Sequence, residues 1–177
     1  VLIAGESGTG KELCARWLSA HVGGPLVAHN CARFASAEEA ETTLFGVSRG
    51  VFSGVDARQG LLERADGGVL FLDEIHVMPL RVQQSLLRFA EDGIQTRIGS
   101  NDQRRLTVRL VLATNLPLGS PELAHDLVAR LFVVALLPLD ARRADLPEIF
   151  QSALGTECAK AGVDCRALAS ELRAAHF

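Results

Sequence analysis

The stretch GESGTGKE, Gly5 to Glu12, decides the fold of this chain because it matches the phosphate-binding pattern G-x-x-x-x-G-K. The apolar run Val1 to Ala4 precedes it, and Lys11 to His21 then carries apolar residues at helical spacing. A strand, a glycine-rich turn and a helix in this order direct backbone N–H groups and a helix N-terminus at one anion. Lys11 would add a cation against the β and γ phosphates. The predicted nucleotide site comprises Gly5, Glu6, Ser7, Gly8, Thr9, Gly10, Lys11 and Glu12.

Glu12 departs from the general pattern, because a carboxylate cannot supply the hydroxyl that usually helps to hold Mg²⁺. One interpretation is a decayed site. Asp73 and Glu74 oppose it, since they follow the apolar run Val69 to Leu72 and offer a second place for the metal. We expect Asp73 to bind Mg²⁺, directly or through water, and Glu74 to act as base on the attacking water. The alternative is an Asp-Glu pair that only caps the next helix.

The rest of the chain predicts an α/β fold. Helices are expected at 11–21, 35–44 and 79–93, and apolar strands at 1–4, 26–28, 69–72, 106–113 and 131–137. Buried strands that alternate with helices imply a parallel sheet covered on both faces. We assign residues 1–139 to this nucleotide-binding core and residues 140–177 to the incomplete beginning of a helical lid subdomain. Residues 49–60 are expected to form a loop or loose hairpin.

Composition narrows the function classes. A net charge of −3 over 177 residues leaves no basic excess for nucleic-acid phosphates, so DNA contact is expected only through flanking domains outside this chain. The four cysteines never form a C-x-x-C pair, which favours reduced thiols in a cytoplasmic protein. No apolar run reaches the roughly 18 residues of a membrane helix, so we expect no membrane partner.

Six motifs in order give the chain a family resemblance. After GESGTGKE come VAHNCARF, LFG, GVFSGV, ADGGVLFLDEI, RLVLATN and DLVARL. The set resembles the AAA+ ATPase domain of the sigma-54-dependent transcription activators, also called bacterial enhancer-binding proteins, truncated here at both ends. In that family the phosphate loop carries the same glutamate, so Glu12 is expected. The resemblance implies an AAA+ P-loop fold, ATP and Mg²⁺ as cofactors, and a ring, usually a hexamer, that remodels the closed complex of sigma-54 RNA polymerase.

The resemblance also implies roles for single residues. The family's sigma-contact loop, GAFTGA, corresponds to Gly50, Val51, Phe52, Ser53, Gly54 and Val55. Asn30 matches the asparagine that holds the catalytic glutamate away from water, Asn115 matches the sensor of the γ-phosphate, and Arg130 matches the arginine finger that acts on a neighbouring subunit. The residues alone favour a Phe52 that packs into its own hairpin and an Asn30 that forms a turn, and they leave Arg130 open as a plain surface residue.

Several positions depart from the family. Three of the six loop positions differ, Ala124 stands where a further arginine is usual, and His76 replaces a glycine. These departures keep two alternatives open. One is a nucleotide-dependent interaction or regulatory module with weak or no hydrolysis, and the other is an AAA+ ATPase with another client. We expect His76 to have a packing or surface role.

Overall fold

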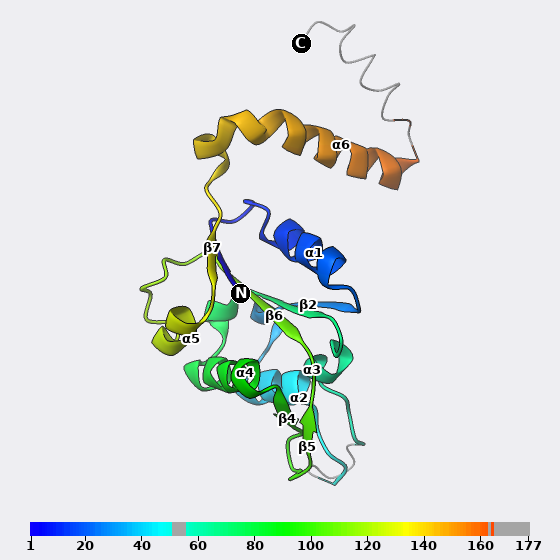
Figure 1. Cartoon of the computed structure of the whole chain (residues 1–177), viewed down its shortest axis with the longest axis vertical. Helices are drawn as coiled ribbons and strands as arrows, with labels where there is room; N and C mark the ends of the chain where they lie inside the picture. Colours follow the sequence, from blue (N-terminus) through cyan, green and yellow to red (C-terminus); the bar gives the residue numbers. More distant parts are fainter. Residues whose placement is uncertain (51–55, 163, 165–177) are drawn as a thin grey trace, which may run out of the picture. The chain divides into compact units, whose positions relative to one another are not determined.

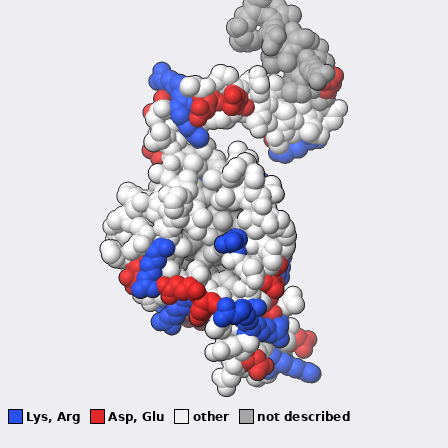
Figure 2. Space-filling view, viewed as in Figure 1, with Lys and Arg blue, Asp and Glu red and all other residues white. Residues whose placement is uncertain are grey.

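The computed structural model describes residues 1–50, 56–162 and 164. The chain divides into two compact units, Val1–Leu136 and Leu137–Phe177. Within the described residues, no helix combines the length and the apolar character needed to cross a membrane. Charged side chains of both signs alternate along one edge of the face in Figure 2, which agrees with the balanced charge of the sequence.

The first unit is built on a five-stranded parallel sheet in the order β2-β3-β6-β1-β7 (Figure 1). Its strands are β1 (Leu2–Ala4), β2 (Leu26–Asn30), β3 (Val69–Asp73), β6 (Arg109–Thr114) and β7 (Val133–Ala135). Strand β3 is apolar and buried from Val69 to Leu72, as a strand covered on both faces must be. The doubly covered parallel sheet predicted from the sequence is confirmed.

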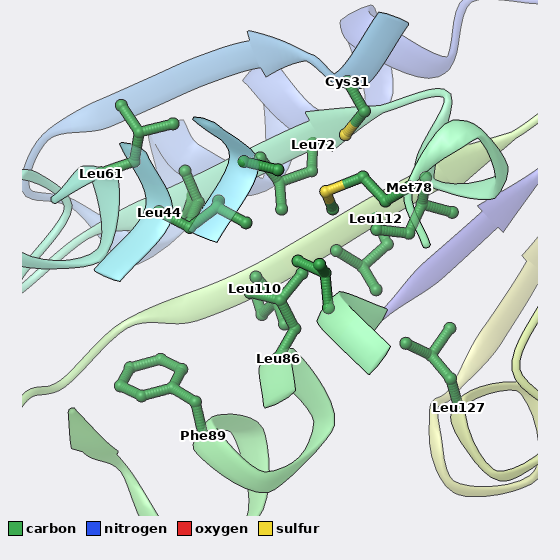
Figure 3. Close-up of a cluster of buried hydrophobic side chains, with 14 of the residues drawn as sticks. Cys31, Leu44, Leu61, Leu72, Met78, Leu86, Phe89, Leu110, Leu112 and Leu127 are labelled. Carbon is green, nitrogen blue, oxygen red and sulfur yellow. The ribbon is translucent and has the colours of Figure 1, made fainter. Parts of the chain in front are cut away.

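Helices cover both faces of this sheet. On one face, α1 (Lys11–Val22) packs Ala15 against Ile3, Phe71 and Val111. The larger core lies on the other face, under α2 (Ala37–Phe45), α3 (Leu61–Arg64), α4 (Leu80–Asp92) and α5 (His125–Arg130). Figure 3 shows its leucines, with Cys31 and Met78 at one end of the cluster. Each fully buried leucine contributes about 1.5–3 kcal/mol, so this side of the sheet is firmly packed.

Some element boundaries differ from the predicted ones. Strand β6 begins at Arg109, because Leu106 instead pairs its backbone with Gly93 beside a two-stranded antiparallel hairpin. That hairpin, β4 (Ile94–Thr96) and β5 (Gln103–Arg105), has no alternating apolar pattern in β5 and was not predicted. The short 3-10 helices η1 (Cys31–Arg33) and η2 (Ile75–Val77) were not predicted either. Single turns of this kind are too short for an apolar period to show.

The second unit contains η3 (Leu139–Asp145) and α6 (Leu146–Ala161). Pro147 lies in the first turn of α6, where its missing N–H costs nothing, and Gly162 ends the helix with a left-handed backbone.

Candidate functional site

The phosphate loop, residues Gly5 to Gly10, turns sharply between β1 and α1. Gly8 and Gly10 have positive φ angles of 82° and 94°, which other residues rarely adopt. A Cβ on Gly5 would lie 2.8 Å from the carbonyl oxygen of Leu136, so a side chain cannot fit there either. Gly10 is the N-cap residue of α1 and has no side chain to accept from the first-turn N–H groups. The loop therefore directs backbone donors and a helix N-terminus at one point, which suits a phosphate.

Lys11 lies within the curve of this loop. Its Nζ donates to the carbonyl oxygens of Gly5 (2.8 Å) and Glu6 (2.9 Å), and the residue is only 9% exposed. Thr9 is also buried, and its hydroxyl donates to the carbonyl of Glu6 at 2.8 Å. Glu12, in contrast, points outward and pairs with Arg16 one turn along α1. The loop thus positions a cation, while the unusual glutamate stays at the surface.

Asp73 and Glu74 follow β3 as a tight turn. Glu74 has φ 54° and ψ 46°, the only positive φ of a non-glycine residue in the described part of the chain. Its N–H donates to Asp73 Oδ1 at 2.9 Å. Such a conformation costs about 1–3 kcal/mol and is typical of functional sites. Glu74 is the N-cap of η2 without a side-chain capping bond, so the capping alternative is not what the side chain does.

A metal ion at this edge would depend on few protein ligands. Among the residues that the structure describes, no group of three or more His, Cys, Asp or Glu side chains could hold a metal ion. The carboxylate of Asp73 is half-buried at the end of β3. This donor set fits Mg²⁺, which is usually held by one or two carboxylates together with phosphates and water.

Asn30 ends β2 directly beside Asp73, its register partner on β3. Its Oδ1 accepts a hydrogen bond from the N–H of Ala32 at 2.8 Å and so caps η1. No hydrogen bond joins Asn30 to Glu74 within the described residues. The turn-forming use of the asparagine is therefore the one present, at a position next to the carboxylates.

Cys31 follows Asn30 and is 1% exposed. Burial raises the pKa of its thiol to about 12, and the nearby charges of Asp73 and Glu74 act in the same direction. The thiol therefore remains neutral beside the two carboxylates. Sequence reasoning missed this proximity, because nothing in the sequence shows that η1 brings Cys31 close to the two carboxylates.

Thr114 ends β6, which lies between β3 and β1 in the sheet, and Asn115 follows it directly. The carbonyl oxygen of Thr114 accepts a hydrogen bond from the N–H of Gly5 at 3.1 Å. Asn115 is exposed at the same edge. The carboxyl ends of three adjacent strands thus bring together the phosphate loop, the Asp73–Glu74 turn and Asn115, where open α/β sheets bind ligands.

His76 contacts this edge as well, which the sequence did not predict. Its Nδ1 lies 3.2 Å from the hydroxyl of Thr114, and its side chain is half-buried. His76 therefore makes a polar contact in addition to the packing or surface role expected from the sequence. The sign in the sequence that could have indicated this contact is the histidine itself, which stands two residues after Glu74 where the family has glycine.

Arg130 lies apart from these contacts, at the end of α5. Its guanidinium forms an exposed ion pair with Glu91 of α4, and the hydrogen bond to Glu91 raises its pKa above the ordinary value. The pair borders a hollow of about 280 Å³. Ala124 is the N-cap residue of α5 and is buried in the core, so its methyl group provides no second cation.

The predicted sigma-contact loop falls largely outside the described residues, since Val51, Phe52, Ser53, Gly54 and Val55 are not among them. Gly50 has a positive φ of 84°. The base of the loop is defined, because Val47 and Arg58 exchange two backbone hydrogen bonds of 2.9 and 3.0 Å.

An ion pair supports the same region. Glu63 is almost buried and accepts hydrogen bonds from Arg97 at 2.8 and 2.6 Å. Arg97 follows β4, so the ion pair connects the hairpin to α3, and the backbone bond from Ser48 to Ile98 connects the residues after β4 to the base of the loop.

Comparison with known proteins identifies the family of this chain. The family model of the sigma-54 interaction domain matches residues 1–137. The DNA-binding transcriptional regulator NtrC of Escherichia coli (strain K12) is 41% identical over 185 residues, which cover 99% of this chain and 39% of NtrC. Regulatory protein LuxO of Vibrio cholerae is 40% identical over 182 residues, covering 97% of this chain and 40% of LuxO.

Solved structures agree. NtrX from Brucella abortus in complex with ADP superposes with a TM-score of 0.75 at 32% identity, covering 92% of this chain and 37% of NtrX. The same protein in complex with ATP gives 0.74 at 32% identity over 91% of this chain and 38% of NtrX. The chain thus spans about two-fifths of the length of these relatives. It belongs to the sigma-54 interaction domain family, the AAA+ ATPase domain of sigma-54-dependent transcriptional regulators.

Proposed function

We propose that this chain binds and hydrolyses ATP with Mg²⁺, and uses the energy to remodel the closed complex of sigma-54 RNA polymerase in the bacterial cytoplasm. The observation that carries the proposal is the meeting of Lys11, the Asp73–Glu74 turn and Asn115 at one edge of adjacent parallel strands. The similarity to NtrX in complex with ADP and with ATP supports nucleotide binding by this chain.

In the proposed mechanism, residues 5–12 bind the phosphates and Lys11 turns from the loop carbonyls to the β and γ phosphates. Glu74 takes a proton from water, whose oxygen attacks the γ-phosphorus as the bond to the leaving oxygen of ADP breaks. Mg²⁺, when bound beside Asp73, would neutralise charge on the phosphate oxygens. Asn115 senses the γ-phosphate, and Asn30 holds Glu74 back until that phosphate is present. For this role, the side-chain NH₂ group of Asn30 must reach Glu74, whether or not its Oδ1 keeps the hydrogen bond from the N–H of Ala32.

We assign Arg130 to a neighbouring subunit's site. Its exposed position at the end of α5, without a contact to its own phosphate loop among the described residues, suits a group that acts in trans. Self-association into a ring, such as a hexamer, would place it there. Residues 140–177 would form the start of a helical lid subdomain.

Residues 50–55 would contact sigma-54, with Phe52 as the apolar anchor. The backbone bridge between Val47 and Arg58 and the nearby Glu63–Arg97 pair give this loop a fixed base on the core. DNA would be bound by other domains of the parent protein, because the charge here is balanced.

The experiment uses the longest available parent protein, trapped with ADP and aluminium fluoride and mixed with purified sigma-54. We expect co-elution that is lost in Phe52→Ala and kept in Phe45→Leu, a matched change of a phenylalanine that packs against the core. Turnover of ATP without any co-elution would instead favour an AAA+ ATPase with another client.

A second candidate is a nucleotide-dependent regulatory module with weak hydrolysis. The specific observation in its favour is Ala124, which is buried where the family usually has a further arginine. Nucleotide binding together with turnover no faster than in Glu74→Gln would select this candidate.

A further inference from the structure

The side chain of Thr114 joins three parts of the proposed site. Its hydroxyl lies 3.2 Å from His76 Nδ1 and accepts a hydrogen bond from the N–H of Leu116 at 3.1 Å. Its backbone carbonyl accepts from the N–H of Gly5 at 3.1 Å. The residue is fully buried at the end of β6. One threonine thus contacts the turn after Glu74, the turn that displays Asn115, and the start of the phosphate loop.

The hydrogen-bonding capacity of the Thr114 hydroxyl indicates which of the two groups, the hydroxyl or His76 Nδ1, is the donor. A hydroxyl has one hydrogen and two acceptor lone pairs, and one lone pair already receives the N–H of Leu116. If Thr114 donates its hydrogen to Nδ1 of His76, the hydroxyl and Nδ1 are both paired. If Nδ1 were the donor instead, the hydroxyl hydrogen would have no acceptor among the described contacts, which is unfavourable in a buried site. Nδ1 is therefore the acceptor and Nε2 carries the proton.

The backbone of His76 belongs to η2, which directly follows the strained turn at Glu74. Glu74 is held in a left-handed conformation by the bond from its own N–H to Asp73 and by the bond from the N–H of Val77 to its carbonyl (3.0 Å). Ile75, fully buried, anchors η2 in the core. His76 contacts Thr114 of β6, so η2 is fastened at two successive residues.

We infer that His76 is a positioning residue for hydrolysis, because its hydrogen bond to the hydroxyl of Thr114 joins the Glu74 turn to the turn that displays Asn115. The inference deepens the proposed function and rests on it. The contact aligns the hydroxyl so that a lone pair faces Leu116, and this bond shapes the backbone around Asn115. His76 itself touches neither phosphate nor water in this role.

The test compares substitutions that keep or lose the acceptor at the Nδ1 position. Asparagine in place of His76 presents its side-chain oxygen near that position, whereas glutamine presents its polar atoms further out, near Nε2. In the parent protein, we expect His76→Asn to keep the turnover number, and His76→Gln and His76→Ala to lower it about tenfold, because displaced reacting groups are costly. The Kd for a fluorescent ADP analogue should stay unchanged in all three. The urea midpoint should stay unchanged in His76→Asn and fall in His76→Gln and His76→Ala, where the buried hydroxyl of Thr114 loses its partner.

Two kinetic results would overturn the inference. One is equal turnover in the wild type and all three variants. The other is a loss in His76→Asn as large as in His76→Ala, accompanied by a lower urea midpoint, which would mean that the ring only fills space.

A second measurement does not depend on hydrolysis. In amide NMR spectra, the signals of Asn115 and Leu116 should shift more in His76→Gln and His76→Ala than in His76→Asn, which loses the ring current of the imidazole but keeps the hydrogen bond. Unshifted signals in all variants contradict the link between the two turns. If the wild type binds ADP but hydrolyses no ATP, the proposed function fails, and these shifts still decide whether His76 sets the Asn115 turn.

Discussion

Gln83 Oε1 accepts a hydrogen bond from the backbone N–H of Ala124 at 2.9 Å. The amide nitrogen of the same side chain donates to the carbonyls of Met78 (2.8 Å) and Glu122 (2.7 Å). Gln83 is fully buried on α4, and Ala124 is the N-cap residue of α5, the helix that ends in Arg130. One glutamine therefore fixes the start of the helix that carries the proposed finger.

Replacement of Gln83 by leucine should destabilise the protein. The three backbone groups would lose their partner in a buried place, and each unpaired group costs about 1–3 kcal/mol. Because water would satisfy some of these groups, we expect the free energy of unfolding in urea to fall by about 2–4 kcal/mol. Gln84→Leu, on the exposed face of the same helix, is the control. Equal unfolding free energies of the two variants would contradict the role of Gln83.

Replacement of Glu74 by glutamine should separate binding from chemistry. The amide keeps the shape of the turn but cannot take a proton from water, so turnover should fall about 100-fold or more. The Kd for ATP should change little, because the phosphate loop is intact. Loss of binding as well would show that the carboxylate is structural.

Arg130 should act only when subunits associate. Activity per subunit is expected to rise with protein concentration, and Arg130→Ala should abolish that rise. Glu91→Gln is the matched control, because it removes the exposed ion pair and leaves the finger in place. Wild-type turnover that is independent of concentration would rule out a site completed by a neighbour.

The buried thiol of Cys31 should make stability fall at high pH. Its pKa is raised from 9.0 to about 12 in the folded protein, so between these values the unfolded chain loses a proton that the folded protein retains. The contribution is complete below pH 9 and is lost at about 1.4 kcal/mol per pH unit above it. Cys31→Ala should unfold with a smaller slope over this range. Identical slopes for the two proteins would mean that the thiol titrates normally.

The Glu63–Arg97 pair should make stability fall in acid. The hydrogen bond from Arg97 lowers the pKa of the Glu63 carboxyl below its ordinary value, against the opposing effect of burial. The stabilisation is present above that ordinary value and disappears as the pH falls through the lowered pKa. Glu63→Gln should therefore be less stable at pH 7, by about 1–3 kcal/mol, with the difference shrinking in acid. Glu38→Gln, at an exposed pair with Arg81, should follow the wild type.

Much of the fold was predictable because its signals are local. The apolar run at Val69 to Leu72 and the glycine spacing of residues 5–10 each occupy a few consecutive positions. Burial on both faces demands continuous apolar residues, and a tight anion-binding turn demands glycine, so these stretches indicate their structure by themselves. Family membership followed from the order of such stretches and is confirmed by the match to residues 1–137.

The hairpin of β4 and β5 could not be predicted in this way. Its second strand, Gln103 to Arg105, is polar and exposed throughout, because it pairs through the backbone and buries no side chain of its own. The left-handed conformation of Glu74 was equally hidden, since glutamate carries no sign of a positive φ.

The sequence alone determined the phosphate loop, the buried strands and the family, because those depend on residues that are neighbours along the chain. Which side chains meet depends on the tertiary fold. His76 and Thr114 lie 38 positions apart, Gln83 and Ala124 lie 41 apart, and both contacts depend on how helices and strands pack together. That packing follows from the strand order β2-β3-β6-β1-β7, which places β6 between β3 and β1. No local pattern encodes this order, since it minimises the free energy of the whole buried core rather than of any one segment.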